Sequence, residues 1–131
     1  MTRKSEIEKV IDQFFHAMDT QNFELMKSLL PEDTTMVHIG TDKDEIWKGW
    51  NTLIEATEEQ FKGLEYYKAS IHDLNVNFSQ SNTTAWYFHL LDAEIKSNGK
   101  LTRLEKARFT GVLEKIDGSW KIMQTHVSVP G

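Results

Sequence analysis

The chain contains no cysteine, and this absence removes several kinds of chemistry at once. Disulfide bonds, thiolate metal sites and a cysteine nucleophile are all excluded. The absence fits a reducing compartment, and we expect a cytoplasmic protein. The first residues, Met1 to Glu6, lead into an amphipathic segment and lack the apolar core of a secretory signal.

The chain also lacks long apolar runs and blocks of like charge. No run approaches the roughly 20 residues that cross a bilayer, so we expect no membrane partner. The net charge of -5 argues against nucleic acid, which binds a basic surface. There is no repeat, linker or low-complexity segment, and the length of 131 residues predicts a single domain, residues 1–131.

Several catalytic and metal-binding motifs are missing as well. No serine lies in a G-x-S-x-G context, which argues against a nucleophile-elbow hydrolase. No two histidines have the spacing of a zinc site, so we expect no metal and no cofactor. Histidines from separate strands could still converge in space. Asp92 and Glu94 alternate with apolar residues, which predicts a solvated strand face.

The first half of the chain has the apolar period of helices. Ser5 and Glu8 have the spacing of a capping box at the start of the first helix. Asn22 can cap a short second helix, and a third helix is predicted from Gly49 to Gly63. Between the second and third helices, residues 35–40 and 46–48 read as short strands.

After Tyr66 the apolar period changes from 3.6 to 2, which predicts long strands. The apolar positions switch from odd to even near His72 and Asp73, so we expect a bulge there. Helices followed by strands indicate the α+β class. We predict three N-terminal helices packed on a strongly curved antiparallel sheet of four long strands plus short strands, forming a cone with a pocket.

Asp117-Gly118 is the strongest hairpin signal in the chain. A two-residue loop pairs Ile116 with Ser119, whereas a three-residue loop with Gly118 in a bulge pairs Lys115 with Ser119. We favour the second register because it requires a positive φ only at glycine. It places Arg108 opposite His126 and Thr110 opposite Gln124.

In that register the last two strands present one apolar and one mixed face. The apolar face suits the helices and the cavity, and it includes Phe109, Met123 and Val127. The mixed face suits a partly polar dimer interface. Its candidate interface residues are Arg108, Thr110, Gln124 and His126, and His126 stays open as a pocket residue if the register slips.

Aromatic residues cluster where the third helix should meet the sheet. They are Trp47, Trp50, Tyr66, Tyr67, Trp86, Tyr87 and Phe88. Aromatic residues dominate ordinary cores, so plain packing is one interpretation, and an aromatic-lined cavity is the other. Trp86 and Phe88 share one face of their strand while Tyr87 and His89 share the opposite one, and we expect the Trp86 face to point inward.

Three local features resemble one known superfamily. They are Ile39-Gly40-Thr41-Asp42, Glu45-Ile46-Trp47-Lys48-Gly49-Trp50, and Asp117-Gly118-Ser119-Trp120-Lys121-Ile122 running on to His126-Val127-Ser128. With the order of elements, these resemble the nuclear transport factor 2-like (cystatin-like) superfamily, and within it the SnoaL-like domains. That superfamily includes isomerases, polyketide cyclases, dehydratases, epoxide hydrolases, a transport factor and kinase association domains. The resemblance implies a homodimer with a cavity, and fold alone does not specify a function.

The resemblance places His38 where isomerase-like members carry their general base. A histidine suits proton abstraction near neutral pH. The isomerases also need a phenol on the first helix, and the matching position here is Phe14, which argues against steroid isomerisation. His38 can equally be a hydrogen-bonded structural histidine.

Three functions therefore stay open. The first is binding of a small-molecule ligand in an apolar pocket, the second is a small cyclase, isomerase or dehydratase with His38 as general base, and the third is a homodimeric association or scaffolding domain. The predicted pocket residues are Phe14, His38, Trp50, Tyr67, Trp86, Phe88, Phe109, Met123 and Val127.

Overall fold

A computed structural model describes residues 2–131 and confirms the α+β class. Helices form the first half of the chain and long strands the second half, with two short strands between α2 and α3. The elements are α1 (Arg3–Thr20), α2 (Phe23–Ser28), β1 (Val37–Ile39), β2 (Ile46–Lys48), α3 (Trp50–Gly63), β3 (Leu64–Phe78), β4 (Thr84–Ser97), β5 (Lys100–Ile116) and β6 (Ser119–Ser128).

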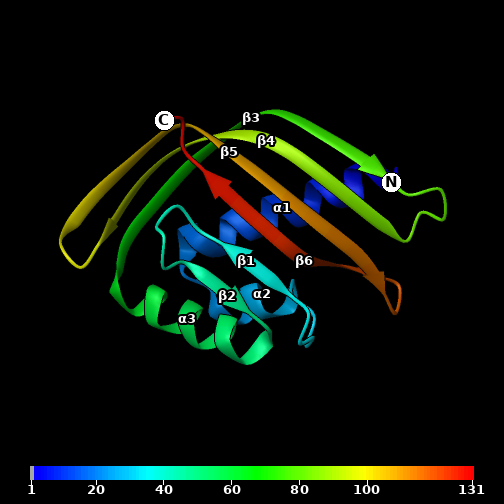
Figure 1. The fold of residues 1–131 in the computed structure, drawn as a ribbon, viewed down its shortest axis with the longest axis horizontal. Helices are drawn as coiled ribbons and strands as arrows, with labels where there is room; N and C mark the ends of the chain where they lie inside the picture. Colours follow the sequence, from blue (N-terminus) through cyan, green and yellow to red (C-terminus); the bar gives the residue numbers. More distant parts are fainter. Residues whose placement is uncertain (1) are drawn as a thin grey trace.

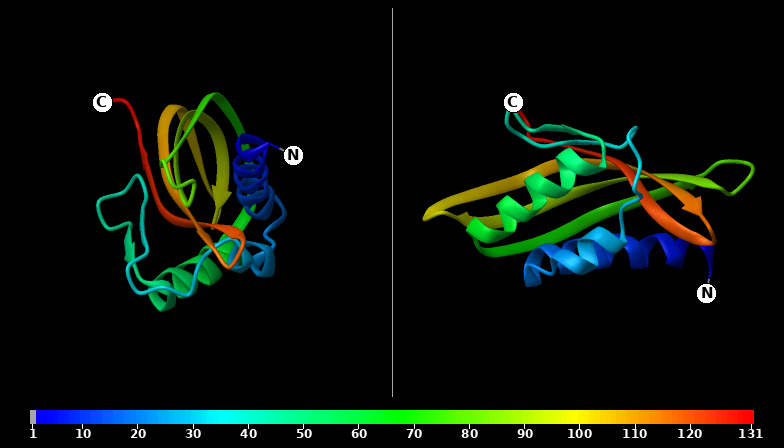
Figure 2. Two further views of the ribbon diagram at one scale, coloured as in Figure 1. Left: turned by 90° about the vertical axis from the view of Figure 1, so that its right-hand side faces the viewer. Right: turned by 90° about the horizontal axis from the view of Figure 1, so that it is seen from below.

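The six strands form one curved sheet in the order β2-β1-β6-β5-β4-β3. Neighbours pair antiparallel except β1 and β6, which run parallel. The sheet stays open, with β2 and β3 at its edges, and the helices lie on its concave side (Figures 1 and 2). None of the helices within residues 2–131 has the length and apolar character needed to cross a membrane.

The helix ends follow local capping chemistry, with one correction. Thr2 is the N-cap of α1, and its hydroxyl accepts from the Ser5 backbone N–H, so the predicted Ser5–Glu8 capping box is wrong. The Ser5 hydroxyl instead donates to the Thr2 carbonyl. The predicted cap of α2 is confirmed, because Asn22 accepts from the backbone N–H of Leu25.

Bulges bend the long strands. The predicted irregularity in β3 is confirmed, since the pairing with β4 shifts between His72 and Asn75 and Asp73 has a φ of 56°. A second shift occurs in β5, where Lys106 has a φ of 53°. An extra residue in one strand increases twist and curvature, so these bulges help the sheet wrap around the helices.

The closing hairpin adopts the register that we did not favour. Ile116 pairs with Ser119, and Asp117 and Gly118 both have positive φ, as a two-residue turn requires. Aspartate tolerates this backbone region better than most residues, so the strain at Asp117 is small. A further shift at Met123 in β6 then sets Thr110 opposite His126, and the predicted Thr110–Gln124 pairing is wrong.

The core lies between the concave face and the helices. Alternate residues of β4 point into it, because Ala85, Tyr87, His89, Leu91 and Ala93 are all buried. Ile7 and Ile11 of α1 pack against this layer and are almost fully buried. The predicted amphipathic pattern of the first helix is thereby explained, since its apolar stripe covers the sheet.

Candidate functional site

A cavity of about 170 Å³ lies between the concave face of the sheet and the helices. Most of its wall is apolar and comes from α1, α2, α3 and all six strands. The lining residues are Phe14, Met18, Met26, Leu30, His38, Ile39, Gly40, Thr41, Glu45, Trp47, Leu53, Thr57, Gln60, Tyr67, Leu91, Ile95, Leu104, Phe109, Thr125 and Val127.

Burial separates the inner end of the cavity from its mouth. Met26, Leu53, Tyr67, Leu91 and Phe109 are buried, and they surround the inner end. Two other lining residues, Thr41 and Gln60, are exposed. The mouth of the cavity therefore lies between the loop before β2, the outer side of α3 and the neighbouring end of β5.

His38 is the principal polar group of the inner wall. The parallel pairing of β1 with β6 aligns His38 with Thr125, and His38 Nδ1 lies 2.6 Å from Thr125 Oγ1. The other ring nitrogen, Nε2, is buried and has no hydrogen-bond partner among residues 2–131. An unpaired buried nitrogen is costly, so a ligand group that bonds to Nε2 would be stabilised there.

Burial also controls the charge of His38. It lowers the pKa of the imidazole from 6.5 to about 4, so the ring is neutral at pH 7. The hydrogen bond to Thr125 can run in either direction. If Thr125 donates, Nε2 carries the proton and is a donor; if Nδ1 donates, Nε2 is an acceptor.

Tyr67 of β3 brings a second polar group to the same cavity. Its side chain is buried, and burial raises the pKa of the phenol well above its usual range. The hydroxyl therefore keeps its proton and can donate to a ligand. The Thr57 hydroxyl also lines the cavity, but it donates to the Leu53 carbonyl at 2.8 Å within α3.

The structure brings five of the predicted pocket residues to the cavity. These are Phe14, His38, Tyr67, Phe109 and Val127. Phe14 and Phe109 meet edge to face, with ring centroids 5.9 Å apart, and form one apolar wall.

The other four predicted pocket residues lie elsewhere. Trp86 and Phe88 are on the convex face, 46% and 39% exposed, so the expectation that this face points inward was wrong. Trp50 begins α3 and packs at the edge of the core without lining the cavity. Met123 occupies the extra position of β6, and the register shift there removes it from the apolar face.

Sequence reasoning missed several lining residues that carried a usable signal. Met18 belongs to the same apolar stripe of α1 as Phe14, four residues further along. Trp47 was recognised in the aromatic cluster but not assigned to the pocket. Thr125 could not be found this way, because its role depends on the long-range pairing of β6 with β1.

The four predicted interface residues share the convex face. Arg108, Thr110, Gln124 and His126 are all exposed, and Thr110 pairs with His126 while Val112 pairs with Gln124. Arg108 donates to the Val129 carbonyl at 3.3 Å and so holds the segment after β6. The exposed rings of Trp86 and Phe88 lie on the neighbouring strand β4.

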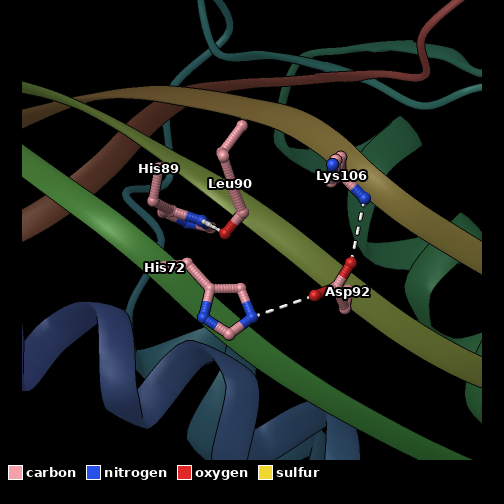
Figure 3. A network of polar contacts seen from close by, with 5 residues as sticks. All are labelled: His72, His89, Leu90, Asp92 and Lys106. Atoms are coloured by element: carbon pink, nitrogen blue, oxygen red, sulfur yellow. Dashed lines mark hydrogen bonds and ion pairs between the residues drawn. The ribbon is translucent and has the colours of Figure 1, made fainter.

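A second histidine, His89, whose contact with Leu90 is drawn in Figure 3, is buried and does not line the cavity. Its Nδ1 lies 3.0 Å from the Leu90 carbonyl oxygen, and its Nε2 has no hydrogen-bond partner in the part of the chain that the structure describes. The ring stacks on Phe109 with centroids 4.9 Å apart, and burial lowers the pKa of the imidazole. Phe109 thus contacts both His89 and the cavity, whereas His89 does not line the cavity.

Asp92 ties the two bulges together on the convex face (Figure 3). One carboxylate oxygen accepts from the Lys106 backbone N–H in β5, and the other lies 2.9 Å from His72 Nε2 in β3. The Lys106 hydrogen bond, more than His72, lowers the pKa of Asp92. Within residues 2–131, no three His, Asp or Glu side chains gather in a way that could hold a metal ion.

Comparisons with solved structures show the same fold. A candidate dehydratase of the nuclear transport factor 2-like family from Streptomyces avermitilis is 16% identical, with a TM-score of 0.84, and the match covers 98% of this chain and 96% of that one. A candidate aromatic ring hydroxylase from Novosphingobium aromaticivorans is 14% identical, with a TM-score of 0.85 and coverages of 98% and 90%. A candidate calcium/calmodulin-dependent protein kinase II association domain from Xanthomonas campestris is 24% identical, with a TM-score of 0.78 and coverages of 95% and 86%.

At such identities these likenesses establish the fold alone, and it is the fold called cystatin-like in a related structure from Nostoc punctiforme. No curated protein matches the chain. The model of one family, the SnoaL-like domain, matches residues 7–131. The chain therefore belongs to the SnoaL-like domain family.

Proposed function

We propose that this domain binds a small, uncharged, largely apolar molecule in the cavity beside His38. The observation that carries the proposal is His38, which lines a mostly apolar cavity and whose buried Nε2 lacks a partner within residues 2–131. Ligand sites are mostly apolar walls with a few placed polar groups that fix orientation. His38 and Tyr67 supply such groups here.

The size of the cavity limits the part of a ligand that it can enclose. A closed apolar cavity of about 150 Å³ is known to accept benzene. The cavity here measures about 170 Å³, so it encloses one substituted ring or an aliphatic group of similar size. A steroid or a fused polyketide would not fit inside it without rearrangement of the walls.

The charges around the cavity favour a neutral ligand. Among the lining residues, Glu45 is the one carboxylic acid, and His38 is neutral at pH 7. No lysine or arginine lines the wall to compensate a buried carboxylate. Burying an unpaired anion is strongly unfavourable, so an acidic ligand should bind more weakly than its neutral counterpart.

The proposal can be tested with phenol and benzoate, two one-ring probes that differ in charge. Titration calorimetry at pH 7 should show phenol binding to the wild-type domain and much weaker binding of benzoate. His38→Leu should remove most phenol binding, whereas His38→Gln, which keeps hydrogen-bonding groups, should retain part of it. Phenol binding that is unchanged in His38→Leu would contradict the proposal.

An enzymatic role with His38 as general base is the alternative. Tyr67 favours it, since a phenol that shares the cavity could stabilise a developing oxyanion. The similarity to a candidate dehydratase and a candidate aromatic ring hydroxylase is compatible with this role. The depressed pKa of His38 weighs against it, because a base works best with a pKa near the working pH.

The convex face supports a further proposal, a homodimer. Trp86 and Phe88 expose apolar surface beside the predicted interface residues Arg108, Thr110, Gln124 and His126. Aromatic residues and arginine are enriched in protein interfaces. Sedimentation at several concentrations should show a dimer that Trp86→Lys dissociates, while His16→Lys, at an exposed site on α1, leaves it intact. A monomer at all concentrations would refute this proposal.

A further inference from the structure

We infer that the ligand is elongated, with an apolar head in the inner cavity and a polar, uncharged tail in a groove outside it. This inference rests on the proposed function and specifies the shape and chemistry of the ligand. The inner cavity alone encloses roughly one ring. A larger molecule can therefore bind only if the part of it that does not fit inside the cavity extends out through the mouth.

The groove lies next to the cavity because the two share part of their walls. Thr41 and Leu104 line both of them. Beyond these residues the groove extends over about 580 Å³, more than three times the volume of the cavity. A molecule whose head contacts Phe109 inside could pass between Thr41 and Leu104 into this outer space.

Hydrogen bonds hold both sides of the groove in place. On one side lies the bulge of β5, where the Lys106 backbone N–H donates to Asp92 at 2.9 Å (Figure 3). On the other side lies Val129, whose carbonyl accepts from Arg108 at 3.3 Å. The groove is thus formed by fixed backbone segments, which lowers the entropic cost of binding there.

The charges of the groove determine the character of the tail. Asp42 and Glu105 are acidic, and Arg103 and Lys106 are basic, so the charges balance. Arg103 is also engaged by Glu94, at 3.4 Å between Nε and Oε2. A groove with balanced charges selects neither anions nor cations, and its donors and acceptors suit an uncharged polar chain.

The test compares phenol with a phenol that carries a triethylene glycol chain in the para position. Calorimetric titration should show that the glycol derivative binds wild-type protein at least about fivefold more tightly than phenol. Val129→Trp should reduce the affinity for the glycol derivative to the level of phenol and leave phenol binding within about twofold, since Val129 lines the groove and not the cavity. Glu58→Trp, at an exposed position of α3 that lines neither space, should change neither affinity.

The results that would refute the two-part ligand differ from those that would refute the proposed function. If phenol binds in a His38-dependent way but the glycol chain adds nothing, the two-part ligand is refuted and the proposed function stands. The same conclusion follows if Val129→Trp weakens both probes equally. If neither probe binds, the proposed function fails, and the inference that rests on it fails too.

Discussion

Acidification should destabilise this domain through His38 before the carboxylates contribute. The pKa of the His38 imidazole is about 4 in the folded protein and near 6.5 when the chain is unfolded. Between these values the unfolded state binds a proton that the folded state excludes. Stability is therefore fully present above pH 6.5 and falls as the pH drops towards 4.

The size of the effect follows from the same two pKa values. One pH unit within this window changes the free energy of unfolding by about 1.4 kcal/mol for each excluded proton. Across the whole window His38 accounts for about 3 kcal/mol, and between pH 6.5 and 5 for about 2 kcal/mol. A domain of this size has a total stability of about 5–15 kcal/mol, so such a loss is easily measured.

Urea unfolding at half-unit steps from pH 7.5 to 5, followed by tryptophan fluorescence, measures this dependence. Below about pH 6, His38→Gln should be less sensitive to acid than wild type, with a slope smaller by up to about 1.4 kcal/mol per pH unit. Parallel curves for the two proteins would refute the reasoning. Asp33, Asp92 and Glu94 have lowered pKa values, so their contributions are lost only at lower pH and do not affect this range.

Three further substitutions test the local structure by the same unfolding assay. Gly111→Ala should cost several kcal/mol, about 3 or more, because the new methyl group would lie 2.4 Å from the buried Tyr87 ring; a loss below about 1 kcal/mol would contradict the close packing. Asp117→Gly should be neutral or slightly stabilising, while Asp117→Val should cost about 1–2 kcal/mol at a φ of 50°; equal stabilities would argue against the two-residue turn. Asn22→Ala should cost about 1 kcal/mol by removing the bond to the Leu25 N–H, and Asn22→Ser should recover most of it.

The fold could be predicted because the apolar period changes once, near Tyr66, and the structure changes there too. Helix ends were predictable where a single residue decides them. Gly49 has a φ of 82° as the N-cap of α3, a backbone region that glycine enters at little cost. The start of α1 could not be predicted in this way. Thr2 and Ser5 are both good N-cap residues, and the local sequence does not determine which of them begins the helix.

The wrong face of β4 could have been corrected from the sequence itself. Asp92 and Glu94 were assigned to a solvated face, and they have the same parity as Trp86 and Phe88. The strand carries no extra residue between Trp86 and Asp92, so all four side chains point outward. The size of the aromatic rings favours burial of Trp86 and Phe88. The alternation of polar and apolar residues along the whole strand instead predicts, correctly, that they are exposed.

The bulge of β6, unlike the bulge of β3, could not be predicted from the parity of the apolar residues. In β3 the buried positions change parity at the bulge, and this change predicted it. In β6 they also change parity, from Trp120 and Ile122 to Thr125. Met123 is apolar and sits at the junction, so the sequence fits a regular strand as well as a bulged one.

The two buried histidines show which part of the site no sequence pattern reveals. His38 and His89 both have a depressed pKa and an unpaired Nε2, yet only His38 borders the cavity, through a pairing with Thr125 that spans 87 residues. A ligand that accepts a hydrogen bond from Nε2 of His38 would favour the tautomer with the proton on that nitrogen. His89 does not line the cavity, and its ring stacks on Phe109, which does. The difference between the two residues thus lies in what surrounds Nε2, and tertiary packing alone determines that.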